Sequence, residues 1–483
     1  MREETIAAIA TPPGSGGIGI IRISGSKALG VVSSLFGRTR KRPDENFVFE
    51  SHIIRHGYIF ELESGSVIDE VLIVPMLGKR SYTAEDVVEI QSHSGPFVMR
   101  TILNQVLLNG ARLAEPGEFT KRAFLNGRID LTQAEAVIDI INAKTVDSLK
   151  IAASQHTGAL KDLINHARLM LVSFLAQIEA AIDFPDETDE LLPVDKGITA
   201  VDEVLSICTR AIQLYDDAHF LRDGIKLVIC GSPNVGKSSL MNRLLEKERA
   251  IVTSVPGTTR DLIEESLNIN GIPFLISDTA GLHQTDDPVE KIGIERAKQH
   301  IKDSDLILFM EVAGSKNFEK EFTNIIPSEK KVILVFNKRD LAEDGYEPEL
   351  PEKYNEIPCI AVSALHNQGI DNLRKMIAQV IVSNFTCDLQ VTCDLEDTCG
   401  RQAMHDLQVK SPSSVVPNLR HKHALEQAVA SLNAAKQGME TNIEVETLAI
   451  DIRDSADFLG QITGDSAGID ILDTIFKNFC LGK

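Results

Sequence analysis

The chain has 483 residues, 43% of them hydrophobic and 25% charged, which is the composition of a soluble globular protein of about three domains. Its net charge of −21 excludes a surface that attracts nucleic acid everywhere, so any RNA site must be a local basic patch or belong to a partner. No apolar run is long enough to span a membrane, the amino terminus does not read as a signal peptide, and the seven scattered cysteines suggest no disulfide framework, so we expect a cytoplasmic location without membrane contact.

Residues 1 to about 118 mix strand and helix patterns. A glycine turn leads into an alternating strand over residues 16–25, and a second strand is expected over residues 71–75. The glycines before the first strand match a dinucleotide-binding loop only weakly, because no strand pattern precedes them and the βαβ unit is missing. The basic run at residues 38–42 could touch RNA, but a solvated loop is the better interpretation.

A helical pattern begins near residue 130, where residues 132–135 form a capping box. Helical patterns also return after residue 380, so we expect an inserted domain between two helical segments that pack together. The further expected helices cover residues 166–182, about 195–220, 423–435, 445–459 and 469–479.

Residues from about 222 to 380 alternate strands and helices, which indicates a parallel sheet with helices on both faces. Asn270-Gly271 lies between two apolar runs and predicts a hairpin, hence one antiparallel pair at the sheet edge. The expected strands are residues 226–230, 274–277, 306–310, 332–336 and 359–362.

The stretch Gly231-Ser232-Pro233-Asn234-Val235-Gly236-Lys237-Ser238 follows the first of these strands and leads into a helix. Strand, glycine loop and helix are the context of a phosphate-binding P-loop, in which backbone N–H groups surround the phosphate oxygens. Lys237 would reach the β- and γ-phosphates, and the Ser238 hydroxyl would bind Mg²⁺.

Further motifs follow the P-loop in the order that a GTPase requires. Asp278 can hold Mg²⁺ through water, Thr259 can complete the Mg²⁺ shell, and the Gly281 N–H can sense the γ-phosphate. Asp340 would accept two hydrogens from guanine, and the Ala364 N–H would bond guanine O6. GTP binding is therefore expected. The residues assigned to the nucleotide are Asn234, Val235, Gly236, Lys237, Ser238, Ser239, Thr253, Ser254, Val255, Pro256, Gly257, Thr258, Thr259, Asp278, Thr279, Ala280, Gly281, Asn337, Lys338, Asp340, Ser363, Ala364 and Leu365.

Catalysis needs a further group. Leu282 stands where Ras-like enzymes have the glutamine that orients the attacking water, and its side chain cannot do so. A carboxylate further along the chain, a partner or a bound cation must then position the water. Another interpretation is a domain that binds GTP and hydrolyses it slowly until it is activated.

With these motifs in place, the whole chain resembles the MnmE (TrmE) family of tRNA-modification GTPases. Besides the P-loop and guanine motifs, the resemblance rests on five stretches of sequence. These are Ala10-Thr11-Pro12-Pro13-Gly14 with residues 19–25, Tyr82-Thr83-Ala84-Glu85-Asp86, Pro116-Gly117-Glu118-Phe119-Thr120, residues 122–127, and the terminal Cys480-Leu481-Gly482-Lys483.

The resemblance implies a fold that combines α/β and all-α domains. It implies an amino-terminal folate-binding-like domain over 1–118 that dimerises the chain, a helical domain in two parts over 119–221 and 381–483, and an inserted Ras-like P-loop GTPase domain over 222–380. A tetrahydrofolate derivative, in its 5,10-methylene or 5-formyl form, would contact Arg22, Glu89, Arg128 and Lys483. Arg128 stands where the family often has lysine, which keeps the charge and changes the geometry.

The resemblance also implies how hydrolysis is activated. K⁺ bound by Asn234, Thr253, Val255 and Thr258 would replace an arginine finger when two GTPase domains pair. Glu290 would orient the attacking water, which answers the problem posed by Leu282, and Cys480 would serve the modification itself. Since Cys480 is a lone terminal cysteine, only the motif around it supports that role.

The family implies partners as well. A homodimer would join a flavoprotein of the MnmG type in a heterotetramer, and together they would add a carboxymethylaminomethyl or aminomethyl group to C5 of the wobble uridine of certain tRNAs. The acidic net charge fits a complex in which the partner carries most of the tRNA-binding surface.

Other interpretations remain open from the sequence. A ribosome-assembly GTPase shares the nucleotide motifs but usually carries a basic RNA-binding domain, which we do not find, and a third possibility is a scaffold whose GTPase gates assembly. The segment at residues 386–399 repeats cysteine every six residues, and with His405 it could hold a metal. Its spacing matches no known zinc knuckle, so we favour a flexible insertion.

Overall fold

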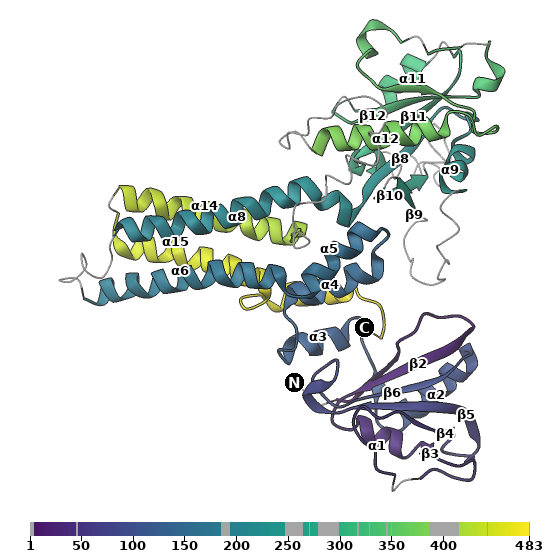
Figure 1. The fold of residues 1–483 in the computed structure, drawn as a ribbon, viewed down its shortest axis with the longest axis vertical. Coiled ribbons are helices and arrows are strands. Elements are labelled where there is room, and N and C mark those ends of the chain that lie inside the picture. Colours follow the sequence, from purple (N-terminus) through teal and green to yellow (C-terminus); the bar gives the residue numbers. More distant parts are fainter. Residues whose placement is uncertain are drawn as a thin grey trace, which may run out of the picture.

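The protein's structure, a computed structural model, describes residues 4–44, 47–184, 194–246, 264–269, 271–278, 299–315, 318–327, 329–343, 346–348, 350–385, 415–441 and 443–482. An amino-terminal sheet, a bundle of long helices and a second sheet form three parts of an extended molecule (Figure 1). Within the described ranges, no helix is long and apolar enough to cross a membrane.

The amino-terminal sheet has seven strands in the order β3-β4-β5-β6-β2-β1-β7, and α1 and α2 cover one face. Ile21 and Ile23 of β2 are fully buried against these helices, so Arg22 between them points to the opposite face. The elements are β1 (Ile6–Ile9), β2 (Gly16–Ser24), α1 (Ala28–Ser33), β3 (Phe36–Gly37), β4 (Arg55–Phe60), β5 (Val67–Met76), β6 (Val87–Ser94), α2 (Pro96–Leu108) and β7 (Arg112–Leu113).

The expectation that no strand precedes the glycine run was wrong. Strand β1 precedes it, and Ile6 of β1 pairs with Ser24 of β2 in an antiparallel register. The two strands are therefore a hairpin, whereas a dinucleotide-binding loop needs parallel strands joined by a helix. The two strands predicted for this part of the chain are confirmed, as β2 and β5.

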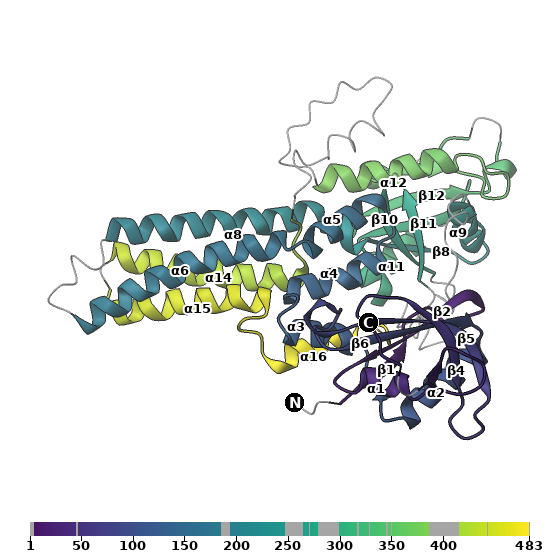
Figure 2. The same cartoon turned by 60° about the horizontal axis from the view of Figure 1, so that its bottom comes forward.

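The helices of the helical part come from two segments of the chain, one before and one after the residues that form the second sheet. Helices α6, α8, α14 and α15 run side by side in both views (Figures 1 and 2), and their apolar faces share one core. The predicted packing of the two helical segments is thereby confirmed. The helices are α3 (Glu118–Leu125), α4 (Leu131–Asn142), α5 (Val146–His156), α6 (Ala159–Asp183), α8 (Val194–Asp223), α14 (Leu419–Glu440), α15 (Val445–Thr463) and α16 (Ile469–Lys477).

Three predicted helix starts need correction, and one of them is α14, which begins at Leu419 rather than at residue 423. The cap of α4 is Asp130, whose carboxylate accepts the Thr132 and Gln133 N–H groups while the Gln133 side chain accepts the Asp130 N–H. The capping box thus begins two residues earlier than predicted, because the residue in extended conformation is Asp130. Helix α6 begins at Ala159 rather than near residue 166, after Gly158 in the left-handed conformation.

Glu135 of α4, which the sequence placed in the capping box, instead joins three helices. Its carboxylate accepts hydrogen bonds from Arg420 at 2.9 and 2.8 Å and lies 2.8 Å from the Nε2 atom of fully buried His421. Arg420 also donates to the Gln461 and Ile462 carbonyls in the last turn of α15. Burial lowers the pKa of His421 to about 4, and although burial opposes ionisation of Glu135, its partners hold that pKa well below the usual range.

The second sheet has the strand order β13-β12-β11-β8-β10-β9, with every pair parallel except β10 and β9. The predicted edge hairpin is confirmed, since Ile269 of β9 pairs with Ile272 of β10. Separate apolar clusters cover the two faces, one with α9 and α12 and the other with α11. The elements are β8 (Ile225–Gly231), α9 (Lys237–Glu246), β9 (Glu264–Ile269), β10 (Ile272–Asp278), β11 (Leu306–Val312), α11 (Phe318–Ile325), β12 (Val332–Asn337), β13 (Cys359–Ala361) and α12 (Ile370–Phe385).

The cysteine repeat at 386–399 and His405 lie outside the described residues. Among the residues that the structure does describe, no group of three or more His, Cys, Asp or Glu side chains is arranged to hold a metal ion. The four described cysteines, Cys208, Cys230, Cys359 and Cys480, are free thiols.

Candidate functional site

The P-loop connects β8 to the first turn of α9, as the sequence predicts. Asn234 and Gly236 adopt left-handed conformations with φ of 58° and 96°. At Gly231, with φ of 136°, a Cβ atom would lie 2.0 Å from the Met310 carbonyl oxygen of the neighbouring strand, so only glycine fits. The loop therefore turns sharply at the carboxyl end of the sheet. The amino terminus of α9, which carries the positive end of the helix dipole, lies directly after it.

Hydrogen bonds within the sheet hold the loop in this shape. The Lys237 Nζ atom donates to the Gly231 and Ser232 carbonyls, both at 2.9 Å. The Ser232 hydroxyl donates to the carboxylate of Glu311, a buried side chain at the end of β11, at 2.5 Å. Glu311 was not among the predicted site residues, because nothing in its local sequence reveals a contact 79 positions away.

The loops after β12 and β13 meet the P-loop through Asn337. Its Nδ2 donates to the Val235 carbonyl at 2.7 Å, and its Oδ1 accepts the Ala364 N–H at 3.0 Å. The N–H that the sequence assigned to guanine O6 thus has a partner within the protein in this structure. One buried side chain thus joins the P-loop to the loop after β13.

Asp340 lies beside this junction, in a short 3₁₀ turn over Arg339–Leu341. The buried Ser363 hydroxyl donates to its carboxylate, and this hydrogen bond is the main reason that the pKa of Asp340 is lowered. An ionised carboxylate whose orientation is fixed by the Ser363 hydroxyl is suited to accept hydrogen bonds from two N–H donors of a ligand.

The structure brings together only part of the predicted nucleotide site. Asp278 ends β10 opposite Ile229 of β8, at the same sheet edge as the P-loop. The predicted residues in the P-loop and in the two loops after β12 and β13 lie together there. The predicted residues Thr253, Ser254, Val255, Pro256, Gly257, Thr258, Thr259, Thr279, Ala280, Gly281 and Glu290 lie outside the described part of the chain.

A second cluster lies on the face of the amino-terminal sheet opposite α1 and α2. Arg22 and Glu89 are opposite one another on β2 and β6, and the Arg22 Nε atom is 2.9 Å from a Glu89 carboxylate oxygen. The guanidinium groups of Arg22 and Arg128 each lie 5.2 Å from the centre of the Tyr82 ring. Phe119 of α3 adds a second aromatic ring, 5.7 Å from Arg22. Two predicted folate residues, Arg22 and Arg128, thus lie against Tyr82, and a third, Glu89, pairs with Arg22. The sequence had marked Tyr82 only as part of a family motif.

The carboxyl end of the chain lies beside the amino-terminal sheet, as Figure 2 shows. The Gly482 carbonyl accepts a hydrogen bond from Arg22 at 3.3 Å, and a Cβ atom at Gly482 would lie 2.3 Å from the Ile9 carbonyl oxygen of β1. Gly482 has φ of 91°, so glycine is needed for both reasons. Cys480 is exposed, two residues before this anchor, and Lys483 lies outside the described residues.

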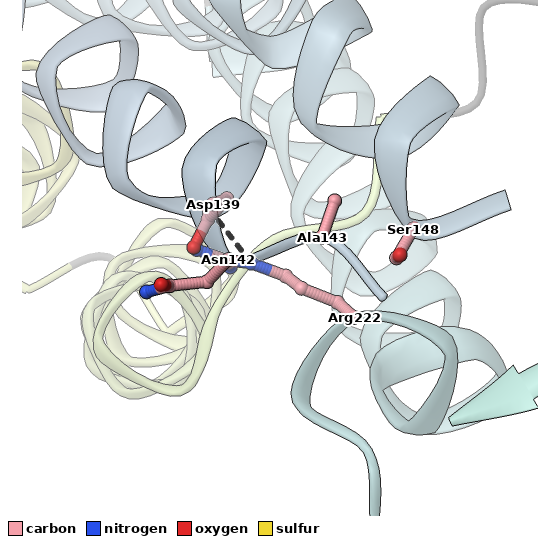
Figure 3. A pocket seen from close by; sticks show the side chains of 5 residues that line it. All are labelled: Asp139, Asn142, Ala143, Ser148 and Arg222. Atoms are coloured by element: carbon pink, nitrogen blue, oxygen red, sulfur yellow. Dashed lines mark hydrogen bonds and ion pairs between the residues drawn. The ribbon is translucent and has the colours of Figure 1, made fainter. Parts of the chain in front are cut away.

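A small cavity of about 40 Å³ lies where the helical part meets the second sheet (Figure 3). Arg222, in the last turn of α8, donates to the Asp139 carboxylate of α4 from both Nε and Nη2. Burial raises the pKa of Asp139 against the pull of Arg222. Gly224 follows in a left-handed conformation and leads into β8, so this ion pair lies at the connection between the two parts. The cavity is lined by Asp139, Asn142, Ala143, Ser148 and Arg222.

Comparison with known proteins covers the whole chain. The model of the MnmE helical domain matches residues 131–480, and the model of the GTP-binding protein TrmE N-terminus matches residues 5–128. The tRNA modification GTPase MnmE of Acetivibrio thermocellus is 41% identical over 484 residues and covers 100% of both chains. The MnmE proteins of Carboxydothermus hydrogenoformans and Geotalea uraniireducens are each 42% identical, and the matches cover 100% of this chain and 100% and 99% of theirs.

Among solved structures, the FeoB G domain from Methanococcus jannaschii is 25% identical, with a TM-score of 0.26 and coverage of 32% of this chain and 97% of that one. The full-length relatives and the two family models agree with an amino-terminal α/β domain, a helical domain and a GTPase domain between the helical segments. The chain belongs to the MnmE (TrmE) family of tRNA modification GTPases.

Proposed function

We propose that the protein uses a cycle of GTP hydrolysis to drive modification of the wobble uridine of certain tRNAs at C5, together with an MnmG-type flavoprotein. The observation that carries the proposal is the anchoring of the chain end: Gly482 is bonded to Arg22, beside Tyr82 and Arg128. The helical bundle thus connects the GTPase sheet to the cluster around Tyr82. The Cys480 thiol lies two residues before Gly482, which anchors the chain end at that cluster. The proposed domains are the amino-terminal domain over residues 1–118, the helical domain over 119–221 with 381–483, and the GTPase domain over 222–380.

The nucleotide would bind where the loops meet. Lys237 and the N–H groups of the P-loop would hold the phosphates, Ser238 and Thr259 would hold Mg²⁺, and Asp340 would accept N–H groups of guanine. The positive φ values of Asn234 and Gly236 support this fit, because they turn successive peptide units into the loop. When bound, Mg²⁺ would neutralise phosphate charge.

Activation would depend on potassium and on pairing of two GTPase domains. Asn234, with Thr253, Val255 and Thr258, would bind K⁺, which supplies positive charge near the phosphates. Glu290 would orient the attacking water, since Leu282 cannot. Of these residues, Asn234 is described, and its side chain is exposed at the tip of the P-loop.

The second cluster is suited to a tetrahydrofolate derivative. Such a ligand carries carboxylates that arginines can pair with, and a planar ring system that can pack on an aromatic side chain. Arg22 and Arg128 provide the charge, Tyr82 the ring, and Glu89 holds Arg22 in place through their ion pair. Lys483 would add a third cation, and Cys480 would act on the uridine. The amino-terminal domains would form a homodimer in the cytoplasm.

Analysis of tRNA nucleosides by mass spectrometry tests this function. A strain that lacks the gene should lose the C5-modified wobble uridine, and the wild-type chain should restore it. A Cys480→Ser variant should fail to restore it, whereas the control Cys359→Ser, at half-buried Cys359 in β13, should succeed. Unchanged wobble uridines in the deletion strain would contradict the proposal and favour a GTPase switch that acts in ribosome assembly.

A further inference from the structure

Arg243 of α9 connects the P-loop helix to the loop after β13. Its Nε atom donates to the Ala364 carbonyl at 2.9 Å, and its Nη2 atom donates to the Leu365 carbonyl at 3.0 Å. A guanidinium presents its N–H groups in a fixed plane, so two bonds to successive carbonyls fix the orientation of both peptide units. No motif of nucleotide-binding proteins marked this residue in the sequence.

The second of these peptide units leads to Asp340. In a trans peptide the carbonyl and the following N–H point in opposite directions, so holding the Leu365 carbonyl also directs the His366 N–H. That N–H donates to the Ser363 hydroxyl at 3.2 Å, and the hydroxyl donates to the Asp340 carboxylate. The contacts form a continuous chain from the guanidinium to the carboxylate.

We infer that Arg243 is a positioning residue for base recognition, which sets the Asp340 carboxylate through the Leu365–His366 peptide and the Ser363 hydroxyl. The inference rests on the proposed assignment of Asp340 to guanine. Helix α9 then serves both ends of the nucleotide, because Lys237 lies in its first turn and Arg243 about 9 Å further along. The chemical group whose recognition depends on Arg243 is the 2-amino group of guanine, the donor that distinguishes guanosine from inosine.

Competitive displacement of a fluorescent GDP analogue from the full-length protein measures this effect. The ratio of the dissociation constants for IDP and GDP reports recognition of the 2-amino group. We expect Arg243→Gln to reduce this ratio about tenfold, because one charge-assisted hydrogen bond would lose its alignment. Arg243→Lys keeps the charge but cannot bond both carbonyls, so it should give a smaller reduction; if Arg243→Gln does not fold, this variant decides the question.

Arg374→Gln is the matched control. Arg374 of α12 donates to the backbone carbonyls of Arg243 and Leu244, so it supports the same helix, and within the described residues no hydrogen bond joins it to the loop after β13. The control should keep the wild-type ratio. Equal loss of GDP and IDP affinity in the Arg243 variants, or an equal change of the ratio in Arg374→Gln, would show that Arg243 merely stabilises the fold and would overturn the inference.

A further variant separates this inference from the proposed function. Asp340→Asn should bind XDP more tightly than GDP, because the amide can donate to the 2-oxo group of xanthine. If Asp340→Asn shows this change while Arg243→Gln keeps the wild-type ratio, the role of Arg243 is wrong and the guanine site stands. If Asp340→Asn shows no change, the assignment of Asp340 to guanine fails, and the role of Arg243 fails with it.

Discussion

The buried residue His421 is expected to make the stability of the helical bundle depend on pH. His421 is fully buried with a pKa of about 4 in the folded protein, against about 6.5 in an unfolded chain. Between these values the unfolded state binds the proton and the folded state does not, so stability falls as the pH decreases from 6.5 to 4. The shift corresponds to about 3 kcal/mol.

We therefore predict that the wild-type protein loses about 3 kcal/mol of stability over this range beyond what a His421→Gln variant loses. Glu135 adds a loss below its unfolded pKa in both proteins, since its folded pKa is lower still. Urea unfolding followed by circular dichroism at several pH values measures the difference. Parallel pH profiles for the two proteins would contradict the assignment of a buried neutral histidine.

Gly482 is a second residue at which the backbone conformation decides the expected effect of a substitution. A Gly482→Ala variant would combine a strained φ of 91° with a contact of 2.3 Å to the Ile9 carbonyl, so the chain end must leave Arg22. We expect the variant to hydrolyse GTP normally but to lose tRNA modification. Gly468→Ala is the control, because Gly468 has an ordinary φ of −68° and no atom near its Cβ position. Full modification activity in Gly482→Ala would refute a role for the anchored end.

At the scale of elements, the Arg222–Asp139 ion pair joins α8 to α4 just before the second sheet begins. Replacing Arg222 with Gln leaves a largely buried carboxylate without its charge partner, at an expected cost of about 3 kcal/mol. Asp139→Asn should cost less, since it removes the charge that needs the partner. The double variant should lose less free energy of unfolding than the two single variants lose in sum. Urea unfolding measures these free energies. Additive effects would show that the two side chains do not interact energetically.

In the second sheet and the helical part the sequence predicted most elements, because their signals are local, whereas in the amino-terminal part it predicted only β2 and β5. Strand ends that carry Gly231, Asp278 and Asn337 follow short apolar runs, and the hairpin at Asn270-Gly271 follows from turn chemistry alone. Helix starts were less accurate, because a cap depends on which residue is extended: Asp130 rather than Thr132 begins α4.

The candidate sites show the same division. Motifs identified the P-loop and the terminal Cys-Leu-Gly-Lys. The contacts of Arg243 and Glu311, however, are with a backbone carbonyl 121 positions away and a hydroxyl 79 positions away, which no local pattern reveals. The arrangement of Arg22 and Arg128 around Tyr82 likewise arises only when β2, the loop before β6 and the chain after α3 are brought together. Which residues lie in contact at these sites therefore depends on tertiary structure, which the motifs alone do not reveal.

For the molecule as a whole, we expect hydrolysis to depend on the monovalent cation, as the proposed role of Asn234 requires. We predict that GTP turnover by the wild-type protein is faster in potassium than in sodium by at least about tenfold, because a suitably sized cation supplies charge stabilisation in the transition state. Asn234→Ala should remove the difference, while Glu290→Ala should keep GTP binding and lose turnover in both salts. Equal rates in the two salts for the wild-type protein would show that Asn234 has no such role.

GTP hydrolysis at the second sheet should drive chemistry beside the chain end that is anchored at the amino-terminal sheet. Reconstitution tests it most directly: the full-length protein, its flavoprotein partner, a methylene-tetrahydrofolate donor and unmodified tRNA are incubated with GTP or with a non-hydrolysable analogue, and wobble uridine products are measured by mass spectrometry. We expect C5-modified uridine with GTP and little or none with the analogue. Equal product with GTP, with the analogue and without nucleotide would contradict it.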